Sequence, residues 1–234
     1  INLNNVTMLT GAPYANRFDT RWTQTHGAPA DGANITISNF TSDTSKPVEF
    51  DIGSGAADHA NLTGNTSSTN KLYFKGTGSV NVLGDANLAG GVYAQNLSHE
   101  DTTTPALNFT GNVTLTDPME FEGVSATFDK GVKASGNDLT LNFTNTATLD
   151  GFSNVANFTS VGAVDLNGNF NTSGFQKYEG NVSLGGDTEL AATTVEFSDG
   201  LTGNSHNLTL SPTSSYIKLD GIQLSGVNEL TIGG

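Results

Sequence analysis

The residues with the clearest chemical potential are asparagines in the pattern Asn-x-Ser/Thr, the acceptor sequence for asparagine-linked glycans. The pattern occurs thirteen times, whereas 26 asparagines and 52 serines and threonines among 234 residues would give about six by chance. Two causes are open: glycosylation of a subset, or a folding pattern that generates the motif incidentally. The thirteen asparagines are Asn5, Asn34, Asn39, Asn61, Asn65, Asn96, Asn108, Asn112, Asn142, Asn157, Asn171, Asn181 and Asn207.

The middle residue of these sequons favours a folding cause. In eleven of the thirteen it is Val, Ile, Leu or Phe, as at Phe109, Phe143 and Phe158. Successive side chains of a β-strand point to opposite faces, so Asn-apolar-Thr places the apolar side chain inward and its neighbours outward. A chain rich in Asn and Thr thus produces sequons through strand patterning alone. The same outward placement would leave some asparagines accessible to a glycosyltransferase.

The sequence contains no recognisable catalytic set. Its histidines, His26, His59, His99 and His206, do not occur at metal-ligand spacings, and no Gly-x-Ser-x-Gly, phosphate-binding or dinucleotide-binding motif is present. We therefore predict no catalytic residue, no metal ligand and no cofactor. The one alternative is a structural calcium ion at turn aspartates such as Asp150 and Asp220.

Polysaccharide-cleaving β-helix enzymes are the main catalytic alternative, because they combine clustered carboxylates with Lys or Arg on one face. From Phe109 onward the basic residues are Lys130, Lys133, Lys177 and Lys218. Their spacing does not point to an active site. The sequence therefore favours a protein that is not an enzyme.

The segment from Gly11 to Asp31 differs from the rest of the chain. It contains both arginines, Arg17 and Arg21, the only tryptophan, Trp22, and His26. One interpretation is a loop that caps an open end of the β-structure, where strand edges need shielding. The other is a binding loop in which Trp22 serves as an aromatic platform.

Charge and composition restrict the class of partner. The formal net charge is −14, with 23 acidic and nine basic residues, so phosphate backbones and anionic lipid surfaces would be repelled. We predict no nucleic-acid partner, and no membrane insertion, because no run of about 18 apolar residues is present. Cysteine is absent, as is common in exported bacterial fibres. The chain opens on Ile1 without a visible signal peptide, which predicts a mature product or an excised fragment.

Short β-strands are expected to carry these side chains. Apolar residues alternate with polar ones, which predicts strands at 34–37, 48–52, 72–74 and 80–83, and no segment has the helical period of about 3.6. The segment 111–115 recurs as 180–184, and the same offset persists over about 30 residues.

This offset of about 69 residues divides into three coils of about 23 residues each. Coils of about 20–25 residues, each with three short strands, are typical of a right-handed parallel β-helix. We therefore predict an all-β solenoid with little or no helix. Its parts are an irregular strand and capping or binding loop over 1–31, less regular coils over 32–108, and regular coils over 109–234.

The segment Tyr178–Thr188, followed by Thr194–Phe197 and Asn207–Leu210, resembles the fibre repeats of two-partner-secreted bacterial exoproteins. These are the filamentous-haemagglutinin-like and high-molecular-weight adhesins. The resemblance covers Phe109–Gly234 best and the first hundred residues in character. It implies a secreted fibre on the bacterial cell surface, exported through an outer-membrane secretion partner, that adheres to host cells, neighbouring bacteria or matrix. Some members carry sugars on Asn-x-Ser/Thr, which would suit the sequons.

The favoured function is therefore a non-catalytic adhesive fibre segment with an extended binding face, whose partners are glycans or proteins of host-cell or bacterial surfaces. Repetition would let many weak contacts act together. A self-assembling extracellular filament subunit is the second hypothesis, because strands such as 6–9 and 229–232 would pair between copies. A polysaccharide-cleaving β-helix enzyme is the third.

Overall fold

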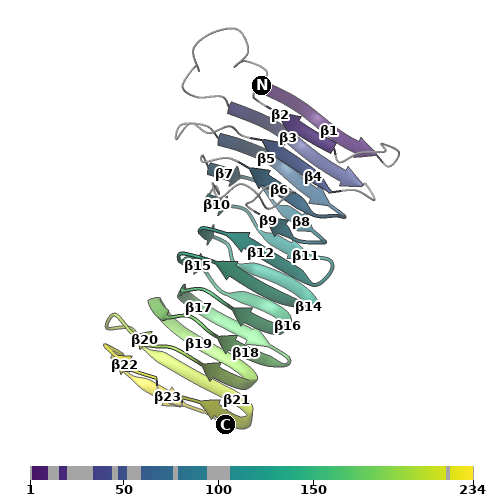
Figure 1. The fold of residues 1–234 in the computed structure, drawn as a ribbon. Coiled ribbons are helices and arrows are strands. Elements are labelled where there is room, and N and C mark those ends of the chain that lie inside the picture. The colour runs from purple at the N-terminus through teal and green to yellow at the C-terminus, as the bar shows by residue number, and fades with distance from the viewer. Residues whose placement is uncertain are drawn as a thin grey trace.

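The computed structural model describes residues 2–9, 16–19, 34–43, 47–51, 59–75, 79–93, 106–219 and 222–233. These residues form an elongated parallel β-solenoid, with the first strand at one end of the stack and the last strand at the other (Figure 1). The described part of the chain contains no helix, and so none that would be long and apolar enough to cross a membrane. The prediction of an all-β parallel solenoid is confirmed.

Short and long strands occur in both parts of the chain. Those before residue 100 are β1 (Asn2–Leu9), β2 (Asn16–Asp19), β3 (Asn34–Asp43), β4 (Val48–Asp51), β5 (His59–Ser68), β6 (Leu72–Lys75), β7 (Ser79–Val82), β8 (Ala86–Leu88) and β9 (Val92–Tyr93). Those after it are β10 (Ala106–Phe109), β11 (Val113–Leu115), β12 (Met119–Gly123), β13 (Ala126–Phe128), β14 (Val132–Phe143), β15 (Ala147–Leu149), β16 (Phe152–Ser160), β17 (Val164–Thr172), β18 (Phe175–Tyr178), β19 (Val182–Phe197), β20 (Leu201–Thr202), β21 (Leu208–Lys218), β22 (Leu224–Ser225) and β23 (Leu230–Ile232).

Each turn of the solenoid contributes in the same order to three faces, which we call A, B and C. Long strands such as β14 and β19 bend at a corner and take part in more than one face. Face A is the ladder through Ala60, Val80, Leu107, Ala126, Ala147, Val164, Val182 and Leu201. Face B is the ladder through Ala86, Val113, Val132, Phe152, Phe170, Leu190 and Leu210. Face C is the ladder through Leu72, Val92, Phe121, Leu141, Ser160, Tyr178 and Phe197.

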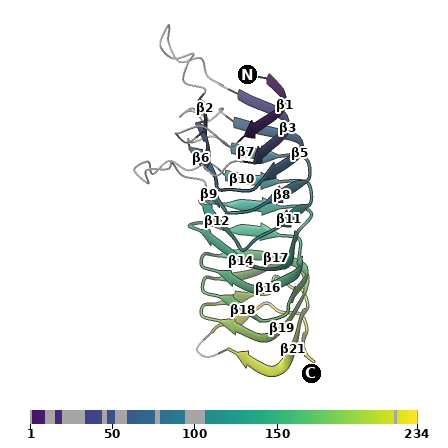
Figure 2. The same ribbon diagram turned by 90° about the vertical axis from the view of Figure 1, so that its right-hand side faces the viewer.

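The core is one column of side chains that runs along the stack visible in Figure 2. Inward positions alternate with outward ones, as in the strand β19, where buried and partly exposed residues follow each other. Aromatic rings of successive turns lie against each other, with centroids 5.0 Å apart for Phe109 and Phe128 and 5.1 Å apart for Tyr178 and Phe197. Each turn thus completes the burial of its neighbour's apolar side chains.

The turns become shorter and more even after residue 106. Measured by the ladder partners on face A, a turn takes about 20–34 residues up to Phe109 and about 17–21 residues from there to Leu184. The expected coil of about 20–25 residues lies within the overall range. The regular part of the chain uses turns close to or below its lower limit.

The offset between the repeated segments does not correspond to a whole number of turns. Val113 lies on face B, whereas its sequence counterpart Val182 lies on face A, so the offset equals three turns and two of the three faces. The division into three coils of equal length is therefore corrected. The repeat recurs because any buried strand position accepts the same apolar side chains, whichever face it occupies.

The four strands predicted in the first hundred residues are present, as β3, β4, β6 and β7. In the segment Gly11–Asp31, which we expected to be irregular, the four residues of β2 form a strand on face C. Arg17 of this strand lies opposite Glu49 of β4 in the ladder. The neighbouring candidates Arg21, Trp22 and His26 lie outside the described residues.

Candidate functional site

The sequons follow the strand pattern that the sequence predicted. At Asn108-Phe109-Thr110 and at Asn207-Leu208-Thr209 the middle side chain is buried, while both neighbours are partly exposed. The same alternation holds for the other sequons whose side chains the structure describes throughout: Asn39, Asn61, Asn65, Asn112, Asn142, Asn157, Asn171 and Asn181. Asn96 lies outside the described residues, and of Asn34 the structure describes only the backbone. Strand patterning therefore accounts for the motif itself.

Several sequon asparagines form ladders between turns, in one case through Asn81, which is not part of a sequon. On face A, Asn81 Nδ2 donates to Asn61 Oδ1 and Asn108 Nδ2 donates to Asn81 Oδ1, both at 2.9 Å. We call these three residues the face-A amide ladder. The exposed Asn5 and Asn39 form a similar pair between the first turns, in which Asn39 Nδ2 donates to Asn5 Oδ1 at 3.0 Å. Parallel stacking places equivalent side chains one strand spacing apart, about 4.8 Å, which suits amide-to-amide hydrogen bonds. The ladders therefore stabilise the stack as well as occupying its surface.

Other sequon asparagines are held by aspartates of the preceding turn. Asn112 donates to Asp85 Oδ1 through its backbone N and its Nδ2, both at 2.9 Å, and Asn157 donates in the same way to Asp138 Oδ1. The bonds from Asn112 lower the pKa of the Asp85 carboxyl, with the charge of Lys130 a smaller contribution. The Nδ2 atoms of Asn112 and Asn157, to which a sugar would be attached, are thus engaged within the fold.

Asn171 and Asn181 differ from these residues. Both are exposed, and no side-chain hydrogen bond with the described residues ties either of them. The side chain of the exposed Asn65 likewise makes no hydrogen bond with the described residues, so these three sequons present the acceptor nitrogen most openly.

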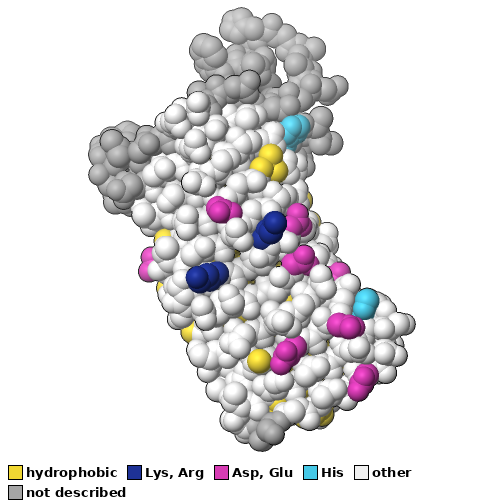
Figure 3. All heavy atoms as spheres, turned by 180° about the vertical axis from the view of Figure 1, so that it is seen from behind, with side chains coloured by type: hydrophobic (Ala, Val, Ile, Leu, Met, Phe, Trp, Pro, Cys, Tyr) yellow, Lys and Arg dark blue, Asp and Glu magenta, His cyan; other side chains and the backbone are white. Residues whose placement is uncertain are grey.

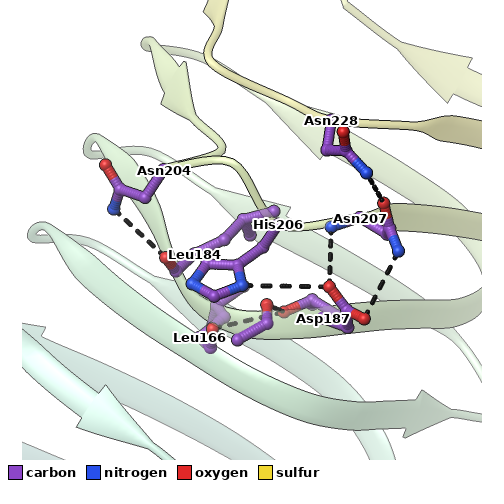
Figure 4. Close-up of polar contacts among 9 residues, drawn as sticks. Leu166, Leu184, Asp187, Asn204, His206, Asn207 and Asn228 are labelled. Carbon is purple, nitrogen blue, oxygen red and sulfur yellow. Dashed lines mark hydrogen bonds and ion pairs between the residues drawn. The ribbon is translucent and has the colours of Figure 1, made fainter.

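A similar tie occurs between the last turns, as Figure 4 shows. Asp187 Oδ1 accepts from the backbone N of Asn207 at 2.8 Å and lies 3.8 Å from Nδ1 of His206. Asn207 in turn accepts from Asn228 Nδ2 at 2.8 Å. His206 and Asp187 come from neighbouring turns, and their contact lies at the corner between faces A and B.

A stacked tyrosine pair lies on face C. The rings of Tyr73 and Tyr93 are 5.0 Å apart and nearly parallel, and Lys71 Nζ lies 5.0 Å from the Tyr93 ring centre. The Tyr93 hydroxyl donates to Glu120 Oε2 at 3.3 Å. Burial, followed by the charge of Glu120, raises the pKa of Tyr93 to about 12. Both rings are more than nine-tenths buried, so they are packed against the fold and do not form an open stacking platform.

An open hollow of about 690 Å³ lies at the corner between faces A and B, over β11, β14 and β16. We call it the corner hollow. Its rim carries Lys130 and Lys133, and its lining includes Asp85, Asn112, Thr114, Asp150, Ser153 and Asn169. In the sequence, these lysines are considered only as possible residues of a polysaccharide-cleaving active site. Their convergence with amide and hydroxyl groups from neighbouring turns depends on the ladder register and has no signal in the sequence.

Within the part of the chain that the structure describes, no group of three or more His, Asp or Glu side chains is placed to hold a metal ion. Asp150, one of the two residues considered for calcium, accepts from Asn167 Nδ2 at 2.9 Å, and Asp220 lies outside the described residues. His59 begins β5, whereas His99 and His26 lie outside the described residues.

No protein-family model, curated protein or solved structure matches the chain. The parallel solenoid is consistent with a β-helical fibre.

Proposed function

We propose that this chain is an adhesive segment of an extracellular fibre on a bacterial surface, and that it binds through an extended face without catalysing a reaction. The observation that carries the proposal is the repetition of outward polar side chains along the stack. On face A the outward row runs through Thr36, Asn61, Asn81, Asn108, Thr127, Thr148, Asp165, Ser183 and Thr202. The amides and hydroxyls of this row both donate and accept hydrogen bonds.

Such a row offers similar contacts about every 4.8 Å along the axis. A ligand that repeats along a surface, such as a glycan layer, would engage many of them, and weak single contacts would add up to stable attachment. The acidic composition supports solubility at high surface density, because like-charged copies repel each other. Export through an outer-membrane partner belongs to the same proposal and rests on the resemblance of the repeats.

Adhesion is tested with the purified chain coupled to beads at defined density. We expect attachment to glycan-coated surfaces or cells that rises steeply with coupling density, without release of reducing ends from the glycan. Attachment that is absent at every density would contradict the proposal. Release of reducing ends that increases with time would instead support the hypothesis of a polysaccharide-cleaving enzyme.

A self-assembling filament subunit is the second candidate, favoured by the exposed apolar side chains of the last turn. Leu224, Leu230 and Ile232 are 42%, 38% and 59% exposed. Their ladder partners Leu201, Leu208 and Leu210 are buried. Sedimentation over a range of concentrations separates the candidates, since filaments grow with concentration.

A further inference from the structure

The corner hollow arises from a difference of one residue between neighbouring corners. From face A to face B the chain takes four steps from Phe128 to Val132, three from Leu149 to Phe152, and four again from Leu166 to Phe170. The middle corner is therefore shorter than those on both sides, and the surface is recessed there.

Two glycines allow the backbones of neighbouring turns to approach each other closely at this corner. Gly131 has a φ of +67°, and a Cβ there would lie 2.4 Å from the carbonyl oxygen of Gly151. Gly151 itself has a φ of +82°. Both conformations favour glycine. The floor of the hollow is closed by the buried side chains of Val132 and Phe152.

The lysines at the rim form no ion pair in the described part of the chain. Lys177 pairs with Glu179, Lys218 pairs with Glu196, and Lys71 lies over a tyrosine ring. Lys130 and Lys133, in contrast, are both exposed. Neither forms a salt bridge or a side-chain hydrogen bond with described residues.

The nearby carboxylates are occupied by amides. Asp85 accepts from Asn112, and Asp150 accepts from Asn167. Both carboxylates keep their negative charge, and Lys130 contributes to lowering the pKa of Asp85, so the hollow holds two acidic and two basic side chains in a chain of net charge −14. Its two ammonium groups form no direct salt bridge with these carboxylates, which leaves them able to contact an anionic group of a ligand. Figure 3 shows a face of the molecule on which basic side chains stand among scattered acidic ones, on a surface that is mostly uncharged.

The rest of the lining suits sugar hydroxyls. Thr114, Ser153, Asn169 and the side-chain oxygen of Asn112 provide hydroxyl and amide groups from three turns. A second hollow of about 480 Å³ follows along the same strands and is lined by Ser135, Gly136, Asn154, Val155, Asn171 and Ser173. Together they accommodate an elongated, hydroxyl-rich ligand better than an isolated ion.

We infer that the corner hollow binds an oligosaccharide that carries a carboxylate sugar, with Lys130 and Lys133 on the carboxylate and the amide and hydroxyl groups on the neighbouring sugars. The inference rests on the proposed function and names the ligand class for one site on the fibre. We expect a ligand with few charges, because the acidic chain would repel a densely charged polymer. At physiological salt the repulsion between a single carboxylate and the acidic groups of the chain is screened beyond about 8 Å.

Calorimetric titration of the whole chain tests the inference with a matched pair of probes. Aldotetrauronic acid, which is xylotriose bearing one glucuronate, is compared with neutral xylotetraose. We expect the acid to bind about tenfold more tightly, equivalent to about 1.4 kcal/mol, and to bind less tightly as salt is raised.

A pair of double variants locates the site. Lys130→Gln/Lys133→Gln is expected to bind the acid no more tightly than the neutral sugar. Lys177→Gln/Lys218→Gln removes the same charge on face C and is expected to keep wild-type affinity within about twofold. Equal affinity for acid and neutral sugar, no binding of the acid, or equal losses in the two variants would overturn the inference.

Inorganic phosphate serves as the competitor. If it binds as tightly as the acid, the site holds anions in general and the sugar assignment is wrong. The proposed function is tested separately by the bead assay, and it is contradicted if the wild-type chain does not attach. Attachment by Lys130→Gln/Lys133→Gln at the wild-type level, combined with loss of acid binding, would support the site and place the adhesive contacts elsewhere.

Discussion

The buried amide of Gln176 tests how the solenoid accommodates polar groups in its core. Gln176 lies in a row of otherwise apolar inward side chains on face C and is completely buried. Its Nε2 atom donates to the carbonyl oxygens of Phe170 and Ala191 at 2.8 and 3.0 Å. Its Oε1 atom accepts from the Tyr178 hydroxyl at 3.0 Å. Burial also raises the pKa of Tyr178 well above its usual value, so the hydroxyl stays protonated and needs an acceptor.

The magnitude follows from the groups that lose partners. Gln176→Leu leaves the Tyr178 hydroxyl without an acceptor and removes a donor from two carbonyls. A buried polar group without a partner costs about 1–3 kcal/mol, so we expect a loss of about 2–4 kcal/mol in the free energy of unfolding. Tyr178→Phe leaves one amide oxygen unpartnered and is expected to cost about 1–2 kcal/mol. In the double variant neither group is left without its partner, because both are removed. The loss in the free energy of unfolding should therefore be smaller than the sum of the two single losses by about 1–2 kcal/mol.

Urea unfolding of the wild type, both single variants and the double variant measures these differences. Hydrogen exchange of the amides of β18 serves as a local readout, because a stack of repeats need not unfold in one step. Additive losses, with coupling below about 0.5 kcal/mol, would refute the network. So would a Gln176→Leu variant as stable as the wild type.

The ladders, turns and titrating groups lead to four more predictions. Asn81→Ala removes the middle of the face-A amide ladder and should lower the free energy of unfolding by about 1–2 kcal/mol in urea titrations, whereas Asn87→Ala, at an exposed position without such bonds, should be neutral. Gly131→Ala should cost about 1–3 kcal/mol in thermal unfolding and more than Gly136→Ala, because both glycines have positive φ but only the first is crowded; equal effects would contradict the packing of the short corner. The pKa of Tyr93 is raised in the folded chain to about 12, so its contribution to stability is present below about pH 10 and is lost as the pH rises through 12; tyrosinate absorbance should show this step in the wild type and lack it in Tyr93→Phe. If chain isolated from its native source carries sugars, peptide mass spectrometry should find them at Asn171 or Asn181 in preference to Asn112 and Asn157, and the reverse order would show that attachment precedes folding.

The fold class could be predicted because it depends on local alternation. Each inward position, such as Leu107 or Phe109, needs only to be apolar, and each outward position needs only to be polar. The sequence records both directly. Turn pairs rich in Gly and Asn likewise mark corners wherever they occur. The sequon excess has the same origin, so the order of residues along the chain is enough to explain it.

The number of residues per turn could not be predicted in the same way. A sequence repeat shows that two segments have equivalent inward and outward positions, but it does not say on which face they lie. Val113 and Val182 share a sequence context and occupy different faces. Only the pairing of Leu149 with Leu166 and of Phe152 with Phe170 establishes how many residues each corner holds.

The candidate site depends on which residues pair between neighbouring turns. Lys130 and Lys133 are two basic residues on a turn when seen in sequence, and nothing there relates them to Ser153 or Asn169, which belong to later turns. Stacking brings these groups together, and the one-residue shortening between Leu149 and Phe152 opens the hollow that they share. In a solenoid, function-bearing features are therefore expected where the turns depart from regularity. A regular corner repeats its neighbours, whereas a shortened one creates a recess at one place in this stretch of the fibre.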